Sequence, residues 1–274
     1  MDIYKQITRF YESVSTEKEI IGKSLFGRNL YAVKMGEGAP IGIAQYGIHA
    51  REFITALLAV EHYRRGLYKG TFWLLPLMNP DGALLSSYGL DSVKSVEDKE
   101  YLLGINGDKQ DFSLWKANGR GVDLNVNFAA NWGEGMKNVR YPCSENYIGE
   151  KPFSELETQA LKRFTLEIKP DYTVSYHTKG EEIYWHFHQS AQKFERDKKL
   201  ALVLSKSTGY PLAYAKGSVG GYKDWCIQSL GIPSFTIEAG ADSFLHPLRE
   251  DGLTDILRKN RNTLYDLSKE YCNE

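Results

Sequence analysis

Short apolar segments alternate with amphipathic segments along almost the whole chain, and this alternation restricts the possible folds more than any other feature. The apolar segments have the length of buried strands and cover residues 30–34, 40–46, 71–77, 171–176 and 232–237. Apolar positions repeat at helical spacing in residues 3–14, 52–65, 156–164, 193–205, 221–230 and 249–271. Because strands that alternate with helices favour an α/β fold, we expect a single domain over residues 1–274, with a mostly parallel, mixed and twisted sheet flanked by helices.

Three local patterns add detail to this expectation. Residues 79–82, Asn-Pro-Asp-Gly, are typical of a turn that closes the strand before them. Ser154 and Glu157 have the spacing of a capping box at the start of a helix. Residues 86–116 show weak periodicity, which predicts a loop-rich surface.

The charge balance excludes one large class of partner. The 34 basic and 35 acidic residues leave a formal charge of −1, which lacks the basic excess that binding to nucleic acid requires. No apolar run reaches the roughly 18 residues of a membrane span, and charged residues interrupt any hydrophobic leader, so neither a membrane segment nor a signal peptide is expected. Cys143, Cys226 and Cys272 lack C-x-x-C spacing, which favours reduced thiols and predicts a cytoplasmic protein.

An imidazole and a carboxylate follow the predicted strand 40–46. His49 and Glu52 are three positions apart, and this spacing lets both side chains face the same way if a helical turn begins there. Alone the pair is a weak signal, because six His and 35 acidic residues in 274 positions produce about 0.8 such pairs by chance.

Two further predicted strands also end in ionisable residues, and they change this assessment. His177 follows residues 171–176 and Glu238 follows residues 232–237. Open α/β sheets bind ligands at the carboxyl ends of their strands, and a buried strand has little structural reason to end in His or Glu. Two His and one Glu leave one position open on a tetrahedral zinc, as in catalytic sites. Glu238 is then the candidate base for a zinc-activated water, which predicts metal-assisted amide hydrolysis.

The chain resembles the zinc carboxypeptidases related to carboxypeptidase A over most of its length. The resemblance rests on Gly-Ile-His-Ala-Arg-Glu at 47–52, Asn-Pro-Asp-Gly at 79–82, Trp-Lys-Ala-Asn at 115–118, Gly-Val-Asp-Leu-Asn at 121–125, Tyr-His at 176–177, Gly-Tyr-Lys-Asp-Trp at 221–225 and Phe-Thr-Ile-Glu at 235–238. It implies one Zn²⁺ per chain bound by His49, Glu52 and His177, with Glu238 as the general base and acid. It also implies that Asp123 hydrogen-bonds a zinc-binding His, which fixes the tautomer and basicity of that ring.

The sequence departs from the family pattern where members hold the terminal carboxylate of the substrate. Family members have Asn-Arg at the end of the Asp-Leu-Asn motif, whereas this chain has Asn125 and Val126, and valine has no donor for a carboxylate. The family arginine that polarises the scissile carbonyl is matched by Lys116, with Arg120 as a rival for the same role.

With these departures, the chain resembles the bacterial branch of γ-D-glutamyl-L-diamino acid peptidases and murein peptide amidases. Members of that branch cut the bond between D-Glu and diaminopimelate or Lys in peptidoglycan peptides. A γ-linked D-Glu has a free α-carboxylate beside the scissile amide, so the cations that bind anions are expected at new positions. The available cations are Arg51, Arg120 and Arg140, and the candidates to bind the charged side chain of the diamino acid are Lys179, Glu181 and Glu182.

The sequence therefore predicts a zinc peptidase that acts on small muropeptides, and it leaves the choice between diaminopimelate and Lys open. One alternative is a metallocarboxypeptidase or amidohydrolase that acts on another peptide or acyl-amino acid. Another is a zinc-dependent binding protein without turnover. The presence of Glu238 argues against this second alternative, because a binding module needs no base beside the metal.

Overall fold

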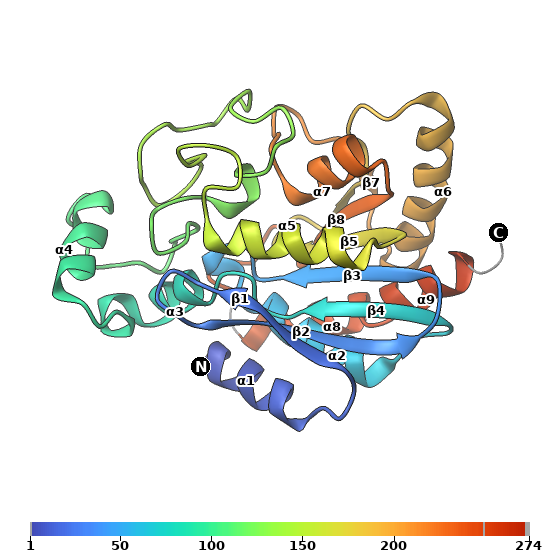
Figure 1. Ribbon diagram of the computed structural model, residues 1–274, viewed down its shortest axis with the longest axis horizontal. Coiled ribbons are helices and arrows are strands. Elements are labelled where there is room, and N and C mark those ends of the chain that lie inside the picture. Colours follow the sequence, from blue (N-terminus) through green and yellow to red (C-terminus); the bar gives the residue numbers. More distant parts are fainter. Residues whose placement is uncertain (1, 249, 272–274) are drawn as a thin grey trace.

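A single eight-stranded sheet crosses the molecule in the computed structural model, which describes residues 2–248 and 250–271 (Figure 1). The strands are β1 (Lys18–Lys23), β2 (Asn29–Glu37), β3 (Ile41–Tyr46), β4 (Gly70–Leu75), β5 (Tyr172–His177), β6 (Glu182–Tyr184), β7 (Leu212–Ala213) and β8 (Ser234–Glu238). Their spatial order is β1-β2-β4-β3-β5-β8-β6-β7. The central strands β4, β3, β5 and β8 are mutually parallel, whereas β1, β2 and β6 pair with their inner neighbours in antiparallel fashion. The predicted mixed α/β fold is confirmed.

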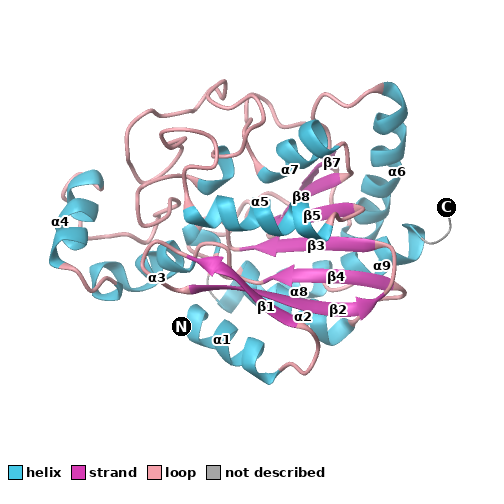
Figure 2. Cartoon of the chain, in the orientation of Figure 1, coloured by secondary structure: helices cyan, strands magenta, loops and turns pink. Residues whose placement is uncertain are grey.

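Helices cover both faces of this sheet. They are α1 (Ile3–Ser13), α2 (Thr55–Arg65), α3 (Pro80–Tyr88), α4 (Val96–Ile105), α5 (Leu156–Ile168), α6 (Ala191–Thr208), α7 (Tyr222–Trp225), α8 (Glu250–Asn260) and α9 (Thr263–Tyr271). Side chains of α5 and α7 share one core cluster with the sheet, and side chains of α2, α6, α8 and α9 share the other. Figure 2 shows α5 in front of the sheet with α2 and α8 behind it.

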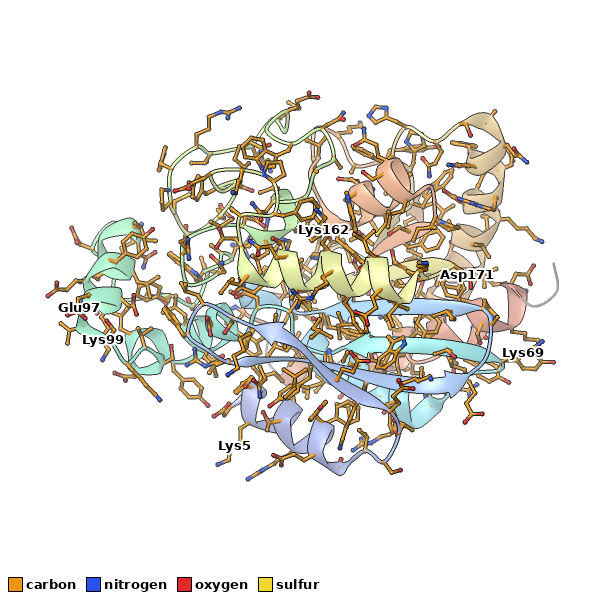
Figure 3. All side chains as sticks on the ribbon, viewed as in Figure 1. Lys5, Lys69, Glu97, Lys99, Lys162 and Asp171 are labelled. Atoms are coloured by element: carbon orange, nitrogen blue, oxygen red, sulfur yellow. The ribbon has the colours of Figure 1, made fainter. Side chains whose placement is uncertain are left out.

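The central strands are buried because both of their faces are covered. Every residue of β4 and β5 is buried, as expected for parallel strands with helices on each side. The buried residues of β5 include the polar side chains of Thr173 and Ser175. Lys5, Lys69 and Glu97 are examples of charged side chains at the periphery of the molecule (Figure 3). In the described ranges, no helix has both the length and the apolar character that crossing a membrane requires.

Two of the predictions made from local sequence patterns are wrong. Residues 79–82 start α3 rather than ending in a turn, because Asn79 accepts a hydrogen bond from the Gly82 N–H at 3.0 Å and Pro80 occupies the first turn, where its missing N–H costs nothing. The capping box is absent, since the Ser154 hydroxyl donates to Glu155 and the Glu157 carboxylate turns inward to Asn118, 3.4 Å away.

Helices also differ from expectation in two regions. Residues 86–116 contain the end of α3 and all of α4, whose first turn is capped by Ser95. The predicted helix over 249–271 is two helices, and residue 249 lies outside the described residues. The break between α8 and α9 is stabilised by a buried hydrogen bond, because the Thr263 hydroxyl donates to the Asn260 carbonyl at 2.7 Å.

Candidate metal and catalytic site

Three neighbouring parallel strands bring the candidate residues to one edge of the sheet. Tyr46 at the end of β3 is level with Tyr176 of β5, and His177 is level with Glu238 of β8. His49 and Glu52 follow β3 directly, so all four side chains originate at the carboxyl ends of adjacent strands. The edge predicted from the sequence to bind a ligand is therefore the edge where these residues meet.

A tight turn after β3 places His49 and Glu52. Gly47 has a φ of +58°, and a Cβ atom there would lie 2.7 Å from the Leu77 side chain, so the turn needs a glycine. A short 3₁₀ turn, η1 (Ala50–Glu52), follows. The Thr55 hydroxyl locks it by accepting from the Gly47 N–H at 3.0 Å and donating to the Glu52 carbonyl at 2.9 Å.

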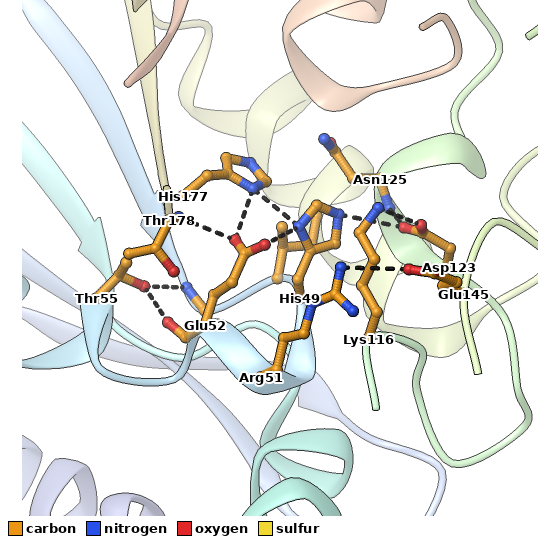
Figure 4. Close-up of polar contacts among 12 residues, drawn as sticks. His49, Arg51, Glu52, Thr55, Lys116, Asp123, Asn125, Glu145, His177 and Thr178 are labelled. Atoms are coloured by element: carbon orange, nitrogen blue, oxygen red, sulfur yellow. Dashed lines mark hydrogen bonds and ion pairs between the residues drawn. The ribbon is translucent and has the colours of Figure 1, made fainter. Parts of the chain in front are cut away.

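Three potential metal ligands converge in this buried turn (Figure 4). Nδ1 of His49 lies 2.9 Å from Oε1 of Glu52, and Nδ1 of His177 lies 3.1 Å from Oε2 of the same carboxylate. The two Nδ1 atoms are 3.0 Å apart. Two imidazole nitrogens and a carboxylate that face one small volume fit a cation, and a donor set of this composition is typical of catalytic zinc.

Asp123 holds the outer side of the His49 ring. Its Oδ1 lies 3.2 Å from Nε2 of His49, and its Oδ2 lies 2.8 Å from Nζ of Lys116. Burial would raise the pKa of Asp123, but the charges of Lys116 and His49 outweigh it and hold that pKa far below its usual range. Burial would likewise lower the pKa of Lys116, whereas Asp123 raises it overall, so both groups are charged.

Glu238 stands next to the three potential ligands with a different electrostatic character. Burial, reinforced by the negative charge of Glu52, raises the pKa of Glu238 to about 7. A carboxyl group with this pKa can both accept and donate a proton near neutrality, which is the property of a general base and acid.

Two adjoining cavities open at this site. The larger has a volume of about 500 Å³, and its wall includes His49, Arg51, Lys116, Val126 and Glu238. The smaller has a volume of about 230 Å³ and includes Lys223, Asp224 and again Glu238 in its wall. Asn125 and Lys216 line both cavities, so the two form one continuous site around Glu238.

The structure brings some of the predicted substrate-binding residues to the site and not others. Arg51 lines the larger cavity, where its guanidinium donates to the Leu114 carbonyl at 3.0 Å and pairs with Glu145 at 3.2 Å. Arg120 lies 3.6 Å from Glu155 and Glu181 lies 2.5 Å from Lys259, so opposite charges hold both elsewhere. Neither lines either cavity.

Further charged residues at the site were missed by the sequence interpretation. Lys137 and Lys216 line the larger cavity from loops, and Lys223 and Asp224 line the smaller one from α7. The resemblance to the family includes the segment 221–225 but assigns no role to Lys223 or Asp224. An adjacent Lys-Asp pair in a short helical segment was the signal that could have drawn attention to it.

Comparison with known proteins agrees with this geometry. The family model described as zinc carboxypeptidase matches residues 3–264. Gamma-D-glutamyl-L-diamino acid endopeptidase 1 of Lysinibacillus sphaericus is 32% identical over 251 residues, which cover 84% of this chain and 62% of that protein. The chain thus spans less than two thirds of the length of this relative.

Two solved structures show the same fold. Bovine thrombin-activatable fibrinolysis inhibitor superposes with a TM-score of 0.75 at 24% identity, covering 98% of this chain and 94% of that one. Murein-tripeptide amidase MpaA from Escherichia coli O157 gives 0.63 at 23% identity, covering 95% of each chain. The ligand set, the fold and the family match agree, and zinc is the metal that they indicate. The chain belongs to the zinc carboxypeptidase family.

Proposed function

We propose that the chain is a zinc peptidase that hydrolyses the γ-D-glutamyl–diamino acid bond of peptidoglycan peptides. The observation that carries the proposal is the meeting of the His49, Glu52 and His177 cluster with Glu238 at one sheet edge, beside a cavity rich in cations. The name of the relative from Lysinibacillus sphaericus supports this substrate class.

In this proposal His49, Glu52 and His177 hold the zinc, the two His through Nδ1. Oδ1 of Asp123 lies 3.2 Å from Nε2 of His49, and its negative charge favours the proton on that nitrogen, which leaves Nδ1 of the ring unprotonated and able to bind metal. When bound, zinc polarises a carbonyl group and lowers the pKa of water.

Glu238 and Lys116 supply the proton transfer and the charge stabilisation. The Glu238 carboxylate takes a proton from the attacking water and returns it to the leaving amine. The ion pair with Asp123 engages one of the three donors of the Lys116 ammonium. The others can stabilise the negative charge that develops on the carbonyl oxygen.

The cations of the larger cavity suit a substrate with more than one carboxylate. Arg51, Lys116, Lys137 and Lys216 line it, against the acidic Glu145 and Glu238. Val126 also lines it and offers no donor, so an ordinary terminal carboxylate has no guanidinium at that position. A γ-linked D-Glu has its α-carboxylate on the other side of the scissile bond, where Arg51 can bind it.

The test compares kcat/KM for L-Ala-γ-D-Glu-diaminopimelate with that for blocked Gly-Phe and Gly-Lys, in the zinc-loaded protein. We expect the murein peptide to be preferred at least tenfold, because a lost charge-assisted hydrogen bond costs roughly 1.5 to 3 kcal/mol. Protein with the zinc removed by a chelator is the blank. A preference for the dipeptides would instead indicate an ordinary carboxypeptidase, and binding without cleavage of any substrate would indicate a binding protein.

A further inference from the structure

A buried ion pair lies in the wall of the smaller cavity, and catalysis as described above does not use it. Lys223 and Asp224 of α7 line this cavity while being only 6% and 5% exposed. Lys223 is the least exposed lysine among the described residues. Since burying charges is costly, a pair that faces a cavity rather than the core needs an explanation.

The pair keeps hydrogen-bonding capacity for a ligand. Nζ of Lys223 lies 2.5 Å from Oδ1 of Asp224 and donates to the His186 carbonyl at 3.2 Å, which uses two of its three donors. The Asp224 carboxylate also accepts from the Gly221 N–H at 3.1 Å, and a carboxylate has about four acceptor positions. A donor and an acceptor of opposite charge therefore lie side by side at the cavity wall.

We propose that Lys223 and Asp224 select the diamino acid of the substrate by binding an amino-acid zwitterion at the far end of its side chain. This inference rests on the proposed function. The ammonium of Lys223 binds the terminal carboxylate of the ligand, and the carboxylate of Asp224 binds its ammonium. The diamino acid that fits is diaminopimelate rather than Lys.

The charge of the pair explains this choice. The positive charge of Lys223 and the negative charge of Asp224 cancel each other. A ligand group that replaces water beside this pair is bound best when it carries one negative and one positive charge, because each residue then meets an opposite charge. A lysine side chain would pair its ammonium with Asp224 but would offer nothing to Lys223, and it would bring an uncompensated charge into the cavity. A zwitterion satisfies both residues and leaves the cavity neutral.

The position and size of the cavity agree with this ligand. Glu238 lines both cavities, so a substrate whose amide bond lies beside it can place the side chain of its diamino acid in the smaller one. Its volume is about 230 Å³. The side chain of diaminopimelate has about eight non-hydrogen atoms beyond its Cα, and Thr236 and Tyr184 give the wall further polar groups.

The experiment measures kcat/KM of the zinc-loaded protein for L-Ala-γ-D-Glu-meso-diaminopimelate and for L-Ala-γ-D-Glu-L-Lys. We expect the unchanged protein to prefer the first peptide at least about tenfold. Lys223→Met should lose about 10- to 100-fold on the diaminopimelate peptide and less than about threefold on the Lys peptide, so the preference collapses. Free meso-diaminopimelate should inhibit competitively and raise the Tm more than L-Lys does, and Lys223→Met should abolish both differences.

Two additional variants keep the test decisive. Lys223→Met with Asp224→Asn removes both charges together, so no unpaired carboxylate stays buried if the single variant fails to fold. Arg196→Met is the matched control, because Arg196 also pairs with the residue that follows it, Asp197 at 2.7 Å, but lies on α6 outside both cavities. The control should keep the preference of the unchanged protein.

The outcomes separate this inference from the proposed function. Equal rates on the two murein peptides, or a preference that survives in folded Lys223 variants, would overturn the assignment of the pair while leaving the proposed function intact. A protein that prefers ordinary dipeptides to both murein peptides would overturn the proposed function itself.

Discussion

Oδ1 of Asp123 lies 3.2 Å from Nε2 of His49, on the opposite side of the ring from the nitrogen that faces Glu52 and His177. The second oxygen of the same carboxylate holds the ammonium of Lys116 at 2.8 Å. A single buried carboxylate therefore orients an imidazole of the metal site and fixes a cation that faces the substrate cavity (Figure 4).

Asp123→Asn should weaken zinc binding about 10- to 100-fold, because the amide is a poorer acceptor for the His49 N–H and no longer carries the charge that stabilises it. We also expect kcat to fall, since Lys116 loses its counter-charge. The zinc Kd is measured by competition with a chelator. Asp91→Asn, on an exposed carboxylate, is the control and should bind zinc like the unchanged protein. Equal affinity in Asp123→Asn would refute the role of this contact.

Glu238→Gln should reduce kcat by about 10²- to 10⁴-fold, because the amide keeps the size of the side chain but cannot accept a proton. Zinc content should not change, since Glu238 is not part of the three-residue cluster. Metal analysis and steady-state kinetics on the same preparation check both expectations. Activity within about threefold of the unchanged protein, which is under 1 kcal/mol of barrier, would place the base elsewhere.

Val126→Arg should improve hydrolysis of ordinary C-terminal L-peptides at least tenfold. Val126 lines the larger cavity, and a guanidinium there could form a charge-assisted bond with a terminal carboxylate, worth roughly 1.5 to 3 kcal/mol. The measurement is kcat/KM on blocked Gly-Phe, with Val126→Met as a control for side-chain length without charge. If neither variant raises kcat/KM for the dipeptide, Val126 is not the reason why ordinary C-terminal L-peptides are hydrolysed slowly.

Glu157 should make the protein less stable as the pH rises from about 5 to 8. Burial, aided by the charge of Asp81, raises the pKa of Glu157 to about 8 in the folded state, from 4.5 for an unperturbed group. Between these values the unfolded chain releases the proton and the folded chain keeps it, so the free energy of unfolding falls with rising pH. At a pH below both pKa values, Glu157 is protonated in the folded and the unfolded state, so it no longer lowers the free energy of unfolding.

Glu157→Gln removes this titration. In urea unfolding we expect the variant to gain stability relative to the unchanged protein between pH 5 and pH 8, by an amount on the order of a few kcal/mol. Comparing the two proteins at each pH cancels the contribution of zinc, which both share. Glu167→Gln, on an exposed residue of the same helix, should show no such gain. A difference that does not depend on pH would contradict the assignment.

The sheet and the metal cluster could be predicted because their signals are local. The strands that end near Tyr46, Tyr176 and Ile237 are short buried segments rich in apolar residues, and each is followed closely by an ionisable residue that a buried strand does not need. The rule that parallel strands present their carboxyl ends at one edge then suffices to bring His49, His177 and Glu238 together.

Other features could not be predicted because contacts distant in sequence decide them. β6 and β7 have only three and two residues, and they exist because β8 and each other offer hydrogen-bonding edges. Glu157 has the spacing of a cap, but the buried amide of Asn118 attracts it instead. Arg120 and Glu181 are charged and near the motifs in sequence, yet Glu155 and Lys259 hold them away from the cavities.

The arrangement of β3 and β5 also makes metal binding depend on folding. Glu52 and His177 are separated by 125 positions and come within 3.1 Å only when the two strands lie side by side in the finished sheet. An unfolded chain, or a fragment that ends before β5, contains no preformed site, so zinc binds almost only to native molecules. Free zinc at about 100 times its Kd would then add roughly 2.7 kcal/mol to the stability of the protein. The zinc supply of the surroundings would thereby determine how long each molecule survives proteolysis.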